Sequence, residues 1–271
     1  MWQNISAGTA LEPGWRVIQI FQVTAASVIV YMTGWFIAAQ IRGRNDIADV
    51  AWGLGFVLVA AVSLIAGHVF SARALLVSNL VLIWGLRLAL HIHSRNRGRG
   101  EDPRYRKWRE EWGTKFVLRS FLQVFMLQGM LLLMVAIPII FVNQAPPALL
   151  GWLDLLGLAI WLFGFGFEAV GDWQLLKFIR NPDKKGTLMT SGLWRYTRHP
   201  NYFGEVTLWW GIWLMTLGLP GGWLTIIGQL TVTILILKVS GIPMLEKPYE
   251  DRADFQEYKR RTSAFFPLPP K

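Results

Sequence analysis

Seven apolar runs separated by polar loops constrain the fold of this chain more than any other feature. Each run is close to the roughly 20 residues that a helix needs to cross a bilayer. A backbone inside lipid must satisfy its own hydrogen bonds, so each run is expected to form a helix. The chain is therefore predicted to be an all-α, polytopic membrane protein, a seven-transmembrane helix bundle with spans at about Val17–Ala39, Ala48–Ala66, Ala74–His91, Val117–Val142, Leu150–Leu176, Tyr202–Leu217 and Trp223–Ile242.

The lysines and arginines test this arrangement, because a wrong number of spans would scatter them over both sides. With seven spans nearly all of them fall on one side, and the opposite side keeps only Arg16 and Arg73. Since cytoplasmic loops are enriched in Lys and Arg, the N-terminus is predicted to lie outside and the C-terminus in the cytoplasm. Met1–Gly14 has no basic region, so a cleavable signal peptide is not expected.

Composition narrows the classes of function. The 271 residues leave no space for a separate soluble domain, so residues 1–271 are expected to form one domain. The absence of Cys excludes thiol nucleophiles and Cys-ligated metals, and the four His make no recognisable ligand set, so no metal is expected. The net charge of +10 is explained by topology rather than by nucleic acid, which is not an expected partner. No obligate protein partner is evident.

The stretch Gly192–Glu205 contains the densest set of groups that can do chemistry. It holds two arginines, His199, Asn201 and several aromatic rings, and Pro200 suits the first turn of the span that follows. Arginines match phosphates and aromatic rings match a flat ring, so an anionic, planar ligand is indicated. The alternative is that the arginines only set the topology and the aromatic residues form an interfacial belt.

Ionisable residues inside the spans form a second group of candidates, because each costs at least a few kcal/mol in a bilayer. Glu168 and Asp172 share a helix face. They are an acid–base pair, a metal pair, or counterions to Arg87, Lys177 and Lys238. All such residues lie near the cytoplasmic ends of the spans and could converge on one pocket: Asp46, Asp49, Arg87, His91, His93, Glu168, Asp172, Glu205 and Lys238.

Three further segments carry local predictions. Ser94–Thr114 is too polar to span and too aromatic to be a free linker. The tail Tyr249–Arg261 is predicted to form a short amphipathic helix on the membrane face or over a site. The small residues Gly164 and Gly166 are expected to allow close helix packing.

Four segments resemble the DUF1295 branch of the steroid 5-alpha-reductase family: Asp49–Phe56, Gly100–Tyr105, Leu193–Glu205 and Arg261–Pro267. The wider superfamily includes sterol C14 and C7 reductases and the isoprenylcysteine carboxyl methyltransferases. The resemblance implies an all-helical membrane bundle with an NADPH pocket that faces the cytoplasm and is built mainly from about residue 160 to 271.

The resemblance also implies roles for single residues. Asn201 matches the asparagine at the nicotinamide region, and Asp172 matches an aspartate that helps to hold the cofactor. Lys177, Arg180 and Lys185 resemble the cations for its phosphates. The other residues expected at the cofactor are Trp194, Arg195, Tyr196, Arg198, His199, Tyr202, Glu205, Glu246 and Tyr258.

The proton donor is where the chain departs from the steroid reductases. Those enzymes use a Gln-Glu pair in span two and a Tyr that closes span three. Span two of this chain instead offers Asp46, Asp49 and Trp52, and span three ends with His91. Asp49 and His91 are the expected donor and its partner, with Tyr105 in reserve.

The resemblance and the residues together predict an integral-membrane, NADPH-dependent reductase of a C=C bond conjugated to a carbonyl. Its hydrophobic, steroid-like or isoprenoid substrate would enter from the membrane lipid, in a membrane of the bacterial inner-membrane or endoplasmic-reticulum type. Two alternatives stay open. One is an S-adenosylmethionine-dependent methyltransferase of the isoprenylcysteine carboxyl type. The other is a non-enzymatic lipid-binding or transport protein that uses Glu168, Asp172 and Lys238 as an ion relay.

Overall fold

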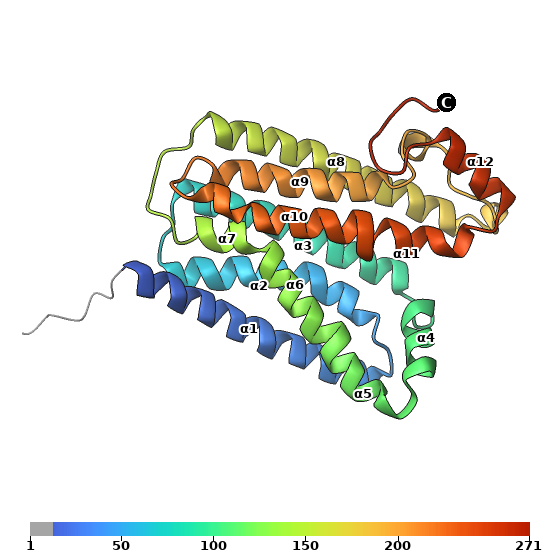
Figure 1. Ribbon diagram of the computed structural model, residues 1–271, viewed down its shortest axis with the longest axis horizontal. Coiled ribbons are helices and arrows are strands. Elements are labelled where there is room, and N and C mark those ends of the chain that lie inside the picture. The colour runs from blue at the N-terminus through green and yellow to red at the C-terminus, as the bar shows by residue number, and fades with distance from the viewer. Residues whose placement is uncertain (1–12) are drawn as a thin grey trace, which may run out of the picture.

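The computed structural model describes residues 13–271 as a bundle whose long helices run mostly along its longest axis (Figure 1). These are α1 (Pro13–Arg42), α2 (Ile47–Gly67), α3 (Ala72–Asn96), α8 (Trp152–Arg180) and α9 (Pro200–Thr216). The shorter helices are α4 (Pro103–Trp112), α5 (Phe116–Arg119), α6 (Leu127–Val135), α7 (Ile137–Val142), α10 (Ile226–Ile234), α11 (Ile242–Glu246) and α12 (Ala253–Arg261). The described residues contain no strand, which confirms the all-α class.

Six helical segments of the described chain are long and apolar enough to cross a membrane. The sixth predicted span, Tyr202–Leu217, falls on α9, whose 17 residues are fewer than the roughly 20 of an ordinary crossing. The predicted outer position of the N-terminus concerns residues outside the described range. The structure is thus that of a multi-pass membrane protein with these six candidate spans: Val17–Arg42, Ile47–Gly67, Ala72–Asn96, Pro103–Val135, Trp152–Arg180 and Gly222–Tyr249.

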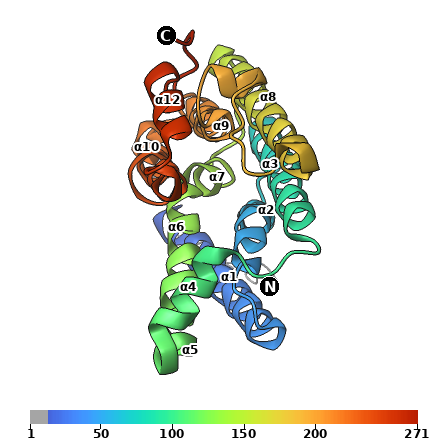
Figure 2. The same cartoon turned by 90° about the vertical axis from the view of Figure 1, so that its right-hand side faces the viewer.

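The polar insert before the fourth predicted span is ordered, as expected. It contains α4, which lies across one end of the bundle (Figures 1 and 2). Trp108 and Trp112 stack there with ring centroids 5.5 Å apart. Gly113 then turns the chain with φ 48°, a conformation that suits glycine. The fourth span follows through α5, a π-helical segment and α6.

Helices α8 and α9 pack through facing glycines, which brings their backbones unusually close. A Cβ placed on Gly164 would lie 2.6 Å from the carbonyl oxygen of Gly204, and one on Gly157 would lie 2.5 Å from that of Gly211. The predicted close packing at Gly164 is confirmed, whereas Gly166 has open space around it. The two helices run antiparallel, so the beginning of α9 lies beside the last turns of α8.

Three large aromatic side chains join α2, α3 and α9 at the centre of the bundle. The ring centroid of Phe56 lies 5.4 Å from that of Trp84 and 4.8 Å from that of Trp209. All three side chains are buried. Gly53 and Gly85 allow the close approach of α2 and α3 beside them. This core fixes α3 relative to the α8–α9 pair.

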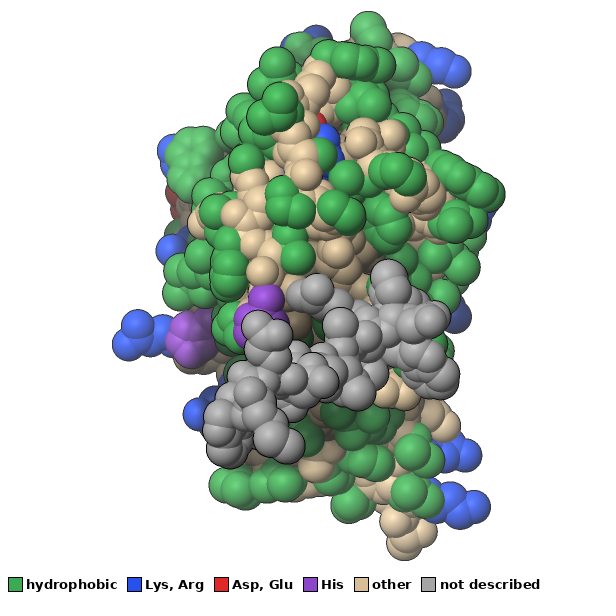
Figure 3. Space-filling view, turned by 90° about the vertical axis from the view of Figure 1, so that its left-hand side faces the viewer, with side chains coloured by type: hydrophobic (Ala, Val, Ile, Leu, Met, Phe, Trp, Pro, Cys, Tyr) green, Lys and Arg blue, Asp and Glu red, His purple; other side chains and the backbone are tan. Residues whose placement is uncertain are grey.

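The two ends of the bundle differ in their polar residues. At one end Arg73 of α3 and Asp154 of α8 form a buried ion pair at 2.6 Å, and most of the visible surface is hydrophobic or uncharged (Figure 3). At the other end α3 and α8 finish, α9 begins, and α4 and α12 lie close by (Figure 2). The predicted tail helix is confirmed as α12, with Phe255 buried.

Candidate functional site

A polar cluster lies in the apolar bundle where α3, α8 and α9 meet. Arg87 of α3 forms ion pairs with Glu168 and Asp172 of α8, the latter with Nη1 2.8 Å from Oδ2. Trp84, three residues before Arg87, donates from Nε1 to Glu168 Oε2 at 2.9 Å. Both carboxylates are buried. The interpretation of these two residues as counterions is confirmed for Arg87.

The two lysines proposed as further counterions lie elsewhere. Lys238 is exposed on the surface of its helix. Lys177 is also exposed, and its Nζ lies 5.5 Å from the ring centroid of Trp173. An ion relay of Glu168, Asp172 and Lys238 is therefore not assembled in this structure.

The beginning of α9 completes the cluster. Asn201 Nδ2 donates to Asp172 Oδ1 at 3.1 Å, and His91 Nε2 lies 3.8 Å from the same oxygen. Gly171 makes this approach possible, because a Cβ there would lie 3.1 Å from the backbone nitrogen of Asn201. Glu205, one turn further along α9, is close enough for the charges of Asp172 and Arg87 to act on it. Four of the predicted site residues thus lie in one place.

This cluster holds more carboxylates than cations. Arg87 faces Glu168, Asp172 and Glu205, and the side-chain carboxylate of Glu205 has no hydrogen bond or ion pair within residues 13–271. Asn201 Oδ1 and Arg87 Nε are buried without a hydrogen-bond partner. Buried polar groups are normally paired, and an excess of buried charge is costly. The cluster therefore offers a ligand both a hydrogen-bond acceptor and negative charge.

Asp49, the predicted proton donor, makes a separate pair of contacts with α4. Its Oδ1 accepts from the hydroxyl of Tyr105 at 2.7 Å, and its Oδ2 accepts from Arg104 Nη2 at 3.2 Å. The predicted partner, His91, contacts Asp172 instead. Asp49 is therefore paired with Tyr105, the residue held in reserve, which is buried.

Tyr202 lies within electrostatic range of both the Asp49–Tyr105 pair and the Arg87 cluster. Its hydroxyl lies near enough to Asp49 and to Glu205 for both charges to act on it. Its ring also stacks on that of His199, with centroids 5.7 Å apart. The two groups of predicted residues consequently face one region of the protein.

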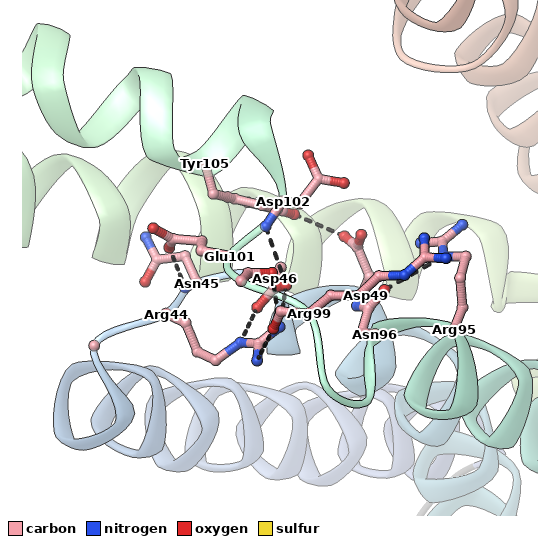
Figure 4. A network of polar contacts seen from close by, with 12 residues as sticks. Arg44, Asn45, Asp46, Asp49, Arg95, Asn96, Arg99, Glu101, Asp102 and Tyr105 are labelled. Atoms are coloured by element: carbon pink, nitrogen blue, oxygen red, sulfur yellow. Dashed lines mark hydrogen bonds and ion pairs between the residues drawn. The ribbon is translucent and has the colours of Figure 1, made fainter. Parts of the chain in front are cut away.

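A second polar network joins the turn between α1 and α2 to the loop before α4 (Figure 4). Asp46 accepts from Arg44 at 2.6 Å and from the backbone N–H of Asp102 at 3.2 Å. Burial opposes the charge of Asp102, but hydrogen bonds from the side chain and backbone of Arg104 lower its pKa. A pocket of about 310 Å³ opens here, lined by Asp46, Arg95, Asn96, Arg99, Gly100, Glu101, Asp102, Pro103 and Arg106.

The loop before α9 is held by the C-terminal segment. Arg198 donates from Nε to Glu246 at 2.8 Å and from Nη1 to the carbonyl oxygen of Thr262 at 2.5 Å. His199 Nε2 lies 2.9 Å from the same carboxylate. Since all the nitrogens of Arg198 contact the protein, this geometry gives Arg198 and Glu246 a positioning role. Their expected contacts with a cofactor stay predictions.

Two more predicted residues strengthen this connection to the tail. Trp194 donates from Nε1 to the carbonyl oxygen of Gly171 at 3.1 Å, and the hydroxyl of Tyr258 donates to the carbonyl oxygen of Trp194. Burial raises the pKa of Tyr258 above its ordinary value. Tyr196 is exposed, and its carbonyl oxygen accepts from the backbone N–H of Leu268 at 3.0 Å. Helix α12 is thereby fixed against the beginning of α9.

The cations expected at the phosphates lie at the end of α8 and in the loops that follow. Arg180 donates to Ser94 Oγ at 3.0 Å, which connects the ends of α8 and α3. All three are exposed and available to an anion: Lys177, Arg180 and Lys185. Arg195, which was also expected at the cofactor, is exposed as well.

Sequence reasoning missed two residues of the site. Trp84 contacts Glu168, and the signal was its position three residues before Arg87, which places both on one helix face. Arg104 holds both Asp49 and Asp102. It follows an Asp-Pro pair that is typical of a helix start, so the residue at which α4 begins was predictable from the sequence.

The comparisons with known proteins give one match. A family model described as "Protein of unknown function (DUF1295)" matches residues 35–262, which include every residue of the two polar networks. Comparison with the curated proteins and with the solved structures found no match.

Proposed function

We propose that this chain, which belongs to the DUF1295 family, is an integral-membrane reductase that uses NADPH. Its reaction would be the reduction of a C=C bond conjugated to a carbonyl in a hydrophobic, steroid-like or isoprenoid substrate. The observation that carries the proposal is the contact between Asn201 and Asp172 beside His91 and Glu205. Asn201, Asp172 and Glu205 were predicted to hold the cofactor, and His91 was predicted to assist the proton donor, although these residues are far apart in the chain.

The topology proposed with this function has seven crossings, with the C-terminus in the cytoplasm. The glycine pairs Gly157–Gly211 and Gly164–Gly204 keep α9 against α8 along much of its length, so the chain returns to the opposite side. The basic loops then lie together. Arg73, a cation of the opposite side, is neutralised by Asp154, which agrees with the positive-inside rule.

The residues present suit the proposed cofactor. Asn201 Oδ1 is a buried acceptor without a hydrogen-bond partner. It could therefore accept a hydrogen bond from the carboxamide N–H of a nicotinamide ring. The exposed cations at the end of α8 suit phosphates, because charged hydrogen bonds to Arg and Lys are the strong ones. NADPH, when bound, supplies the hydride, and the protein orients it and polarises the acceptor.

The Asp49–Tyr105 pair is the proton-donating group in this proposal. The hydroxyl of Tyr105 donates to Asp49 Oδ1 at 2.7 Å, and Arg104 holds Asp49 in place. Reduction of an enone places negative charge on the carbonyl oxygen, and a preorganised donor stabilises that charge. Burial of Tyr105 keeps this donor away from water.

Methyl transfer from S-adenosylmethionine is the second candidate function, and one observation favours it. A sulfonium cation would suit the excess of carboxylates around Arg87. The exposed cations favour NADPH, because S-adenosylmethionine carries no phosphate.

A cofactor-binding experiment tests the proposed function. The protein in mild detergent would be heated with NADPH, NADH or S-adenosylmethionine, and its melting temperature recorded. NADPH should stabilise it, and Asn201→Ala should weaken NADPH binding about tenfold, the size of a lost hydrogen bond. Asn79→Ala, an exposed position on α3, is the control. Stabilisation by S-adenosylmethionine alone would replace the reductase with the methyltransferase.

A further inference from the structure

The pocket before α4 has acidic residues that are all neutralised by arginines outside its lining. Asp46 pairs with Arg44 at 2.6 Å, and Glu101 pairs with Arg109 at 3.0 Å. The third acid, Asp102, pairs with Arg104 at 3.0 Å. None of these three arginines lines the pocket. Each carboxylate of the lining therefore already has an arginine partner, and Asp102 shares its partner, Arg104, with Asp49.

The arginines that do line the pocket have no acidic partner in the described chain. Arg99 and Arg106 are exposed and make no side-chain hydrogen bond or ion pair, and Arg95 donates only to Asn96 Oδ1 at 3.3 Å. Three guanidinium groups around one hollow repel each other unless an anion lies between them. Arginine matches phosphate in shape as well as in charge. The lining thus has the chemistry of a phosphate site.

The loop that carries Arg99, and that joins Arg95 of α3 to Arg106 of α4, is held in place by other residues. Arg44 donates to the carbonyl oxygens of Arg99 and Gly100 at 3.3 and 3.5 Å. The backbone N–H of Asn45 donates to Glu101 at 2.7 Å. The free guanidinium groups are therefore carried by two helix ends and a loop whose positions other residues fix, and such preorganisation lowers the cost of binding.

We propose that this pocket binds a phosphate group. If the protein binds NADPH, as the proposed function holds, that group is the 2′-phosphate that distinguishes NADPH from NADH. Arg87, His91 and Arg95 are spaced four residues apart on α3 and form one stripe from the Asn201 cluster to the pocket. Eight residues at the rise of an α-helix make this stripe about 12 Å long. An extended dinucleotide covers that length.

The test uses the double variant Arg99→Gln/Arg106→Gln in nanodiscs of zwitterionic lipid. The binding of NADPH and NADH would be measured by nicotinamide fluorescence. NADPH binding should weaken by about tenfold to a hundredfold, the effect of lost hydrogen bonds to a charged group, while NADH binding stays unchanged. Arg97→Gln is the matched control, because Arg97 is exposed on the same loop and does not line the pocket. Equal losses for both nucleotides, or no loss, would overturn the proposal.

A separate measurement tests the phosphate site even if the proposed function is wrong. If the wild-type protein binds neither nucleotide, its melting temperature would be recorded with inorganic pyrophosphate and, separately, in nanodiscs that contain phosphatidic acid. A rise that disappears in the double variant supports the phosphate site and identifies its source as a soluble phosphate or a lipid headgroup. No rise with either probe overturns the site.

Discussion

The same two helices, α3 and α8, carry an arginine–carboxylate contact at both ends. Arg73 contacts Asp154, and fourteen residues further along each helix Arg87 contacts Glu168. The first contact is a balanced pair, because one arginine donates to both oxygens of one carboxylate at 2.6 and 2.8 Å. The second contact is unbalanced, because Arg87 also contacts Asp172, and Glu205 lies near both.

This difference separates a structural contact from a functional one. A balanced buried pair satisfies its own charges and needs nothing further. An unbalanced group in a membrane protein is costly, and such groups mark binding and reaction sites. The unfilled hydrogen-bonding capacity of Asn201 and Arg87 lies at the unbalanced end. The two ends should therefore respond oppositely to substitution.

The largest effect is expected at the balanced end. Arg73→Met should reduce stability by about 3–5 kcal/mol, because it leaves the charge of Asp154 buried and alone. Arg73→Met/Asp154→Leu should regain most of that loss, since an apolar pair of similar volume replaces the ion pair. Unfolding by denaturing detergent measures both. A single variant as stable as the wild type would show that this end does not need its ion pair.

The proton-donating pair should affect the reaction rate and leave stability nearly unchanged. Tyr105→Phe and Asp49→Asn should each slow turnover by about a hundredfold, at the low end for general acid catalysis. NADPH affinity should stay near normal, because neither residue belongs to the Asn201 cluster. Stopped-flow oxidation of bound NADPH with an accepted enone is the measurement. Full turnover in Asp49→Asn would remove this pair from the mechanism.

The smallest effect is expected from relief of the excess charge. Glu205→Gln should raise stability by about 1 kcal/mol, because it removes a carboxylate that has no partner. Substitutions at functional sites often raise stability in this way. The same change should weaken cofactor binding. Asp154→Asn is the contrasting variant and should lower stability. A loss of stability in Glu205→Gln would show that the cluster is balanced by contacts within the protein.

The sequence was sufficient for the helices and for the convergence of the polar residues, since both follow from apolar periodicity and from the alternation of topology. It predicted that Asn201, Asp172 and His91 would lie together, and they do. It did not predict the partner of Asp49, because the position of α4 depends on hydrogen bonds of Asp46 and Glu101 that join distant loops.

The roles within the loop before α9 were also beyond the sequence. Arg198 was expected at the cofactor from its neighbours, but its guanidinium contacts Glu246 and Thr262, which are more than forty positions later in the chain. Pairing between residues so far apart in the chain leaves no periodic pattern in the sequence from which it could be predicted. The predicted span Tyr202–Leu217 agrees with α9, Pro200–Thr216, to within two residues at each end, because a 17-residue helix that packs against α8 through glycines retains the apolar pattern of a span.

The most direct test of the difference between the two ends is hydrogen–deuterium exchange with and without NADPH. The account predicts slower exchange with NADPH in residues 193–205 and 95–106, which contain the Asn201 cluster and the arginine-lined pocket. Residues 72–78 and 150–156, around Arg73 and Asp154, should exchange equally in both conditions. Protection confined to the Arg73 end, or no protection at all, would contradict it.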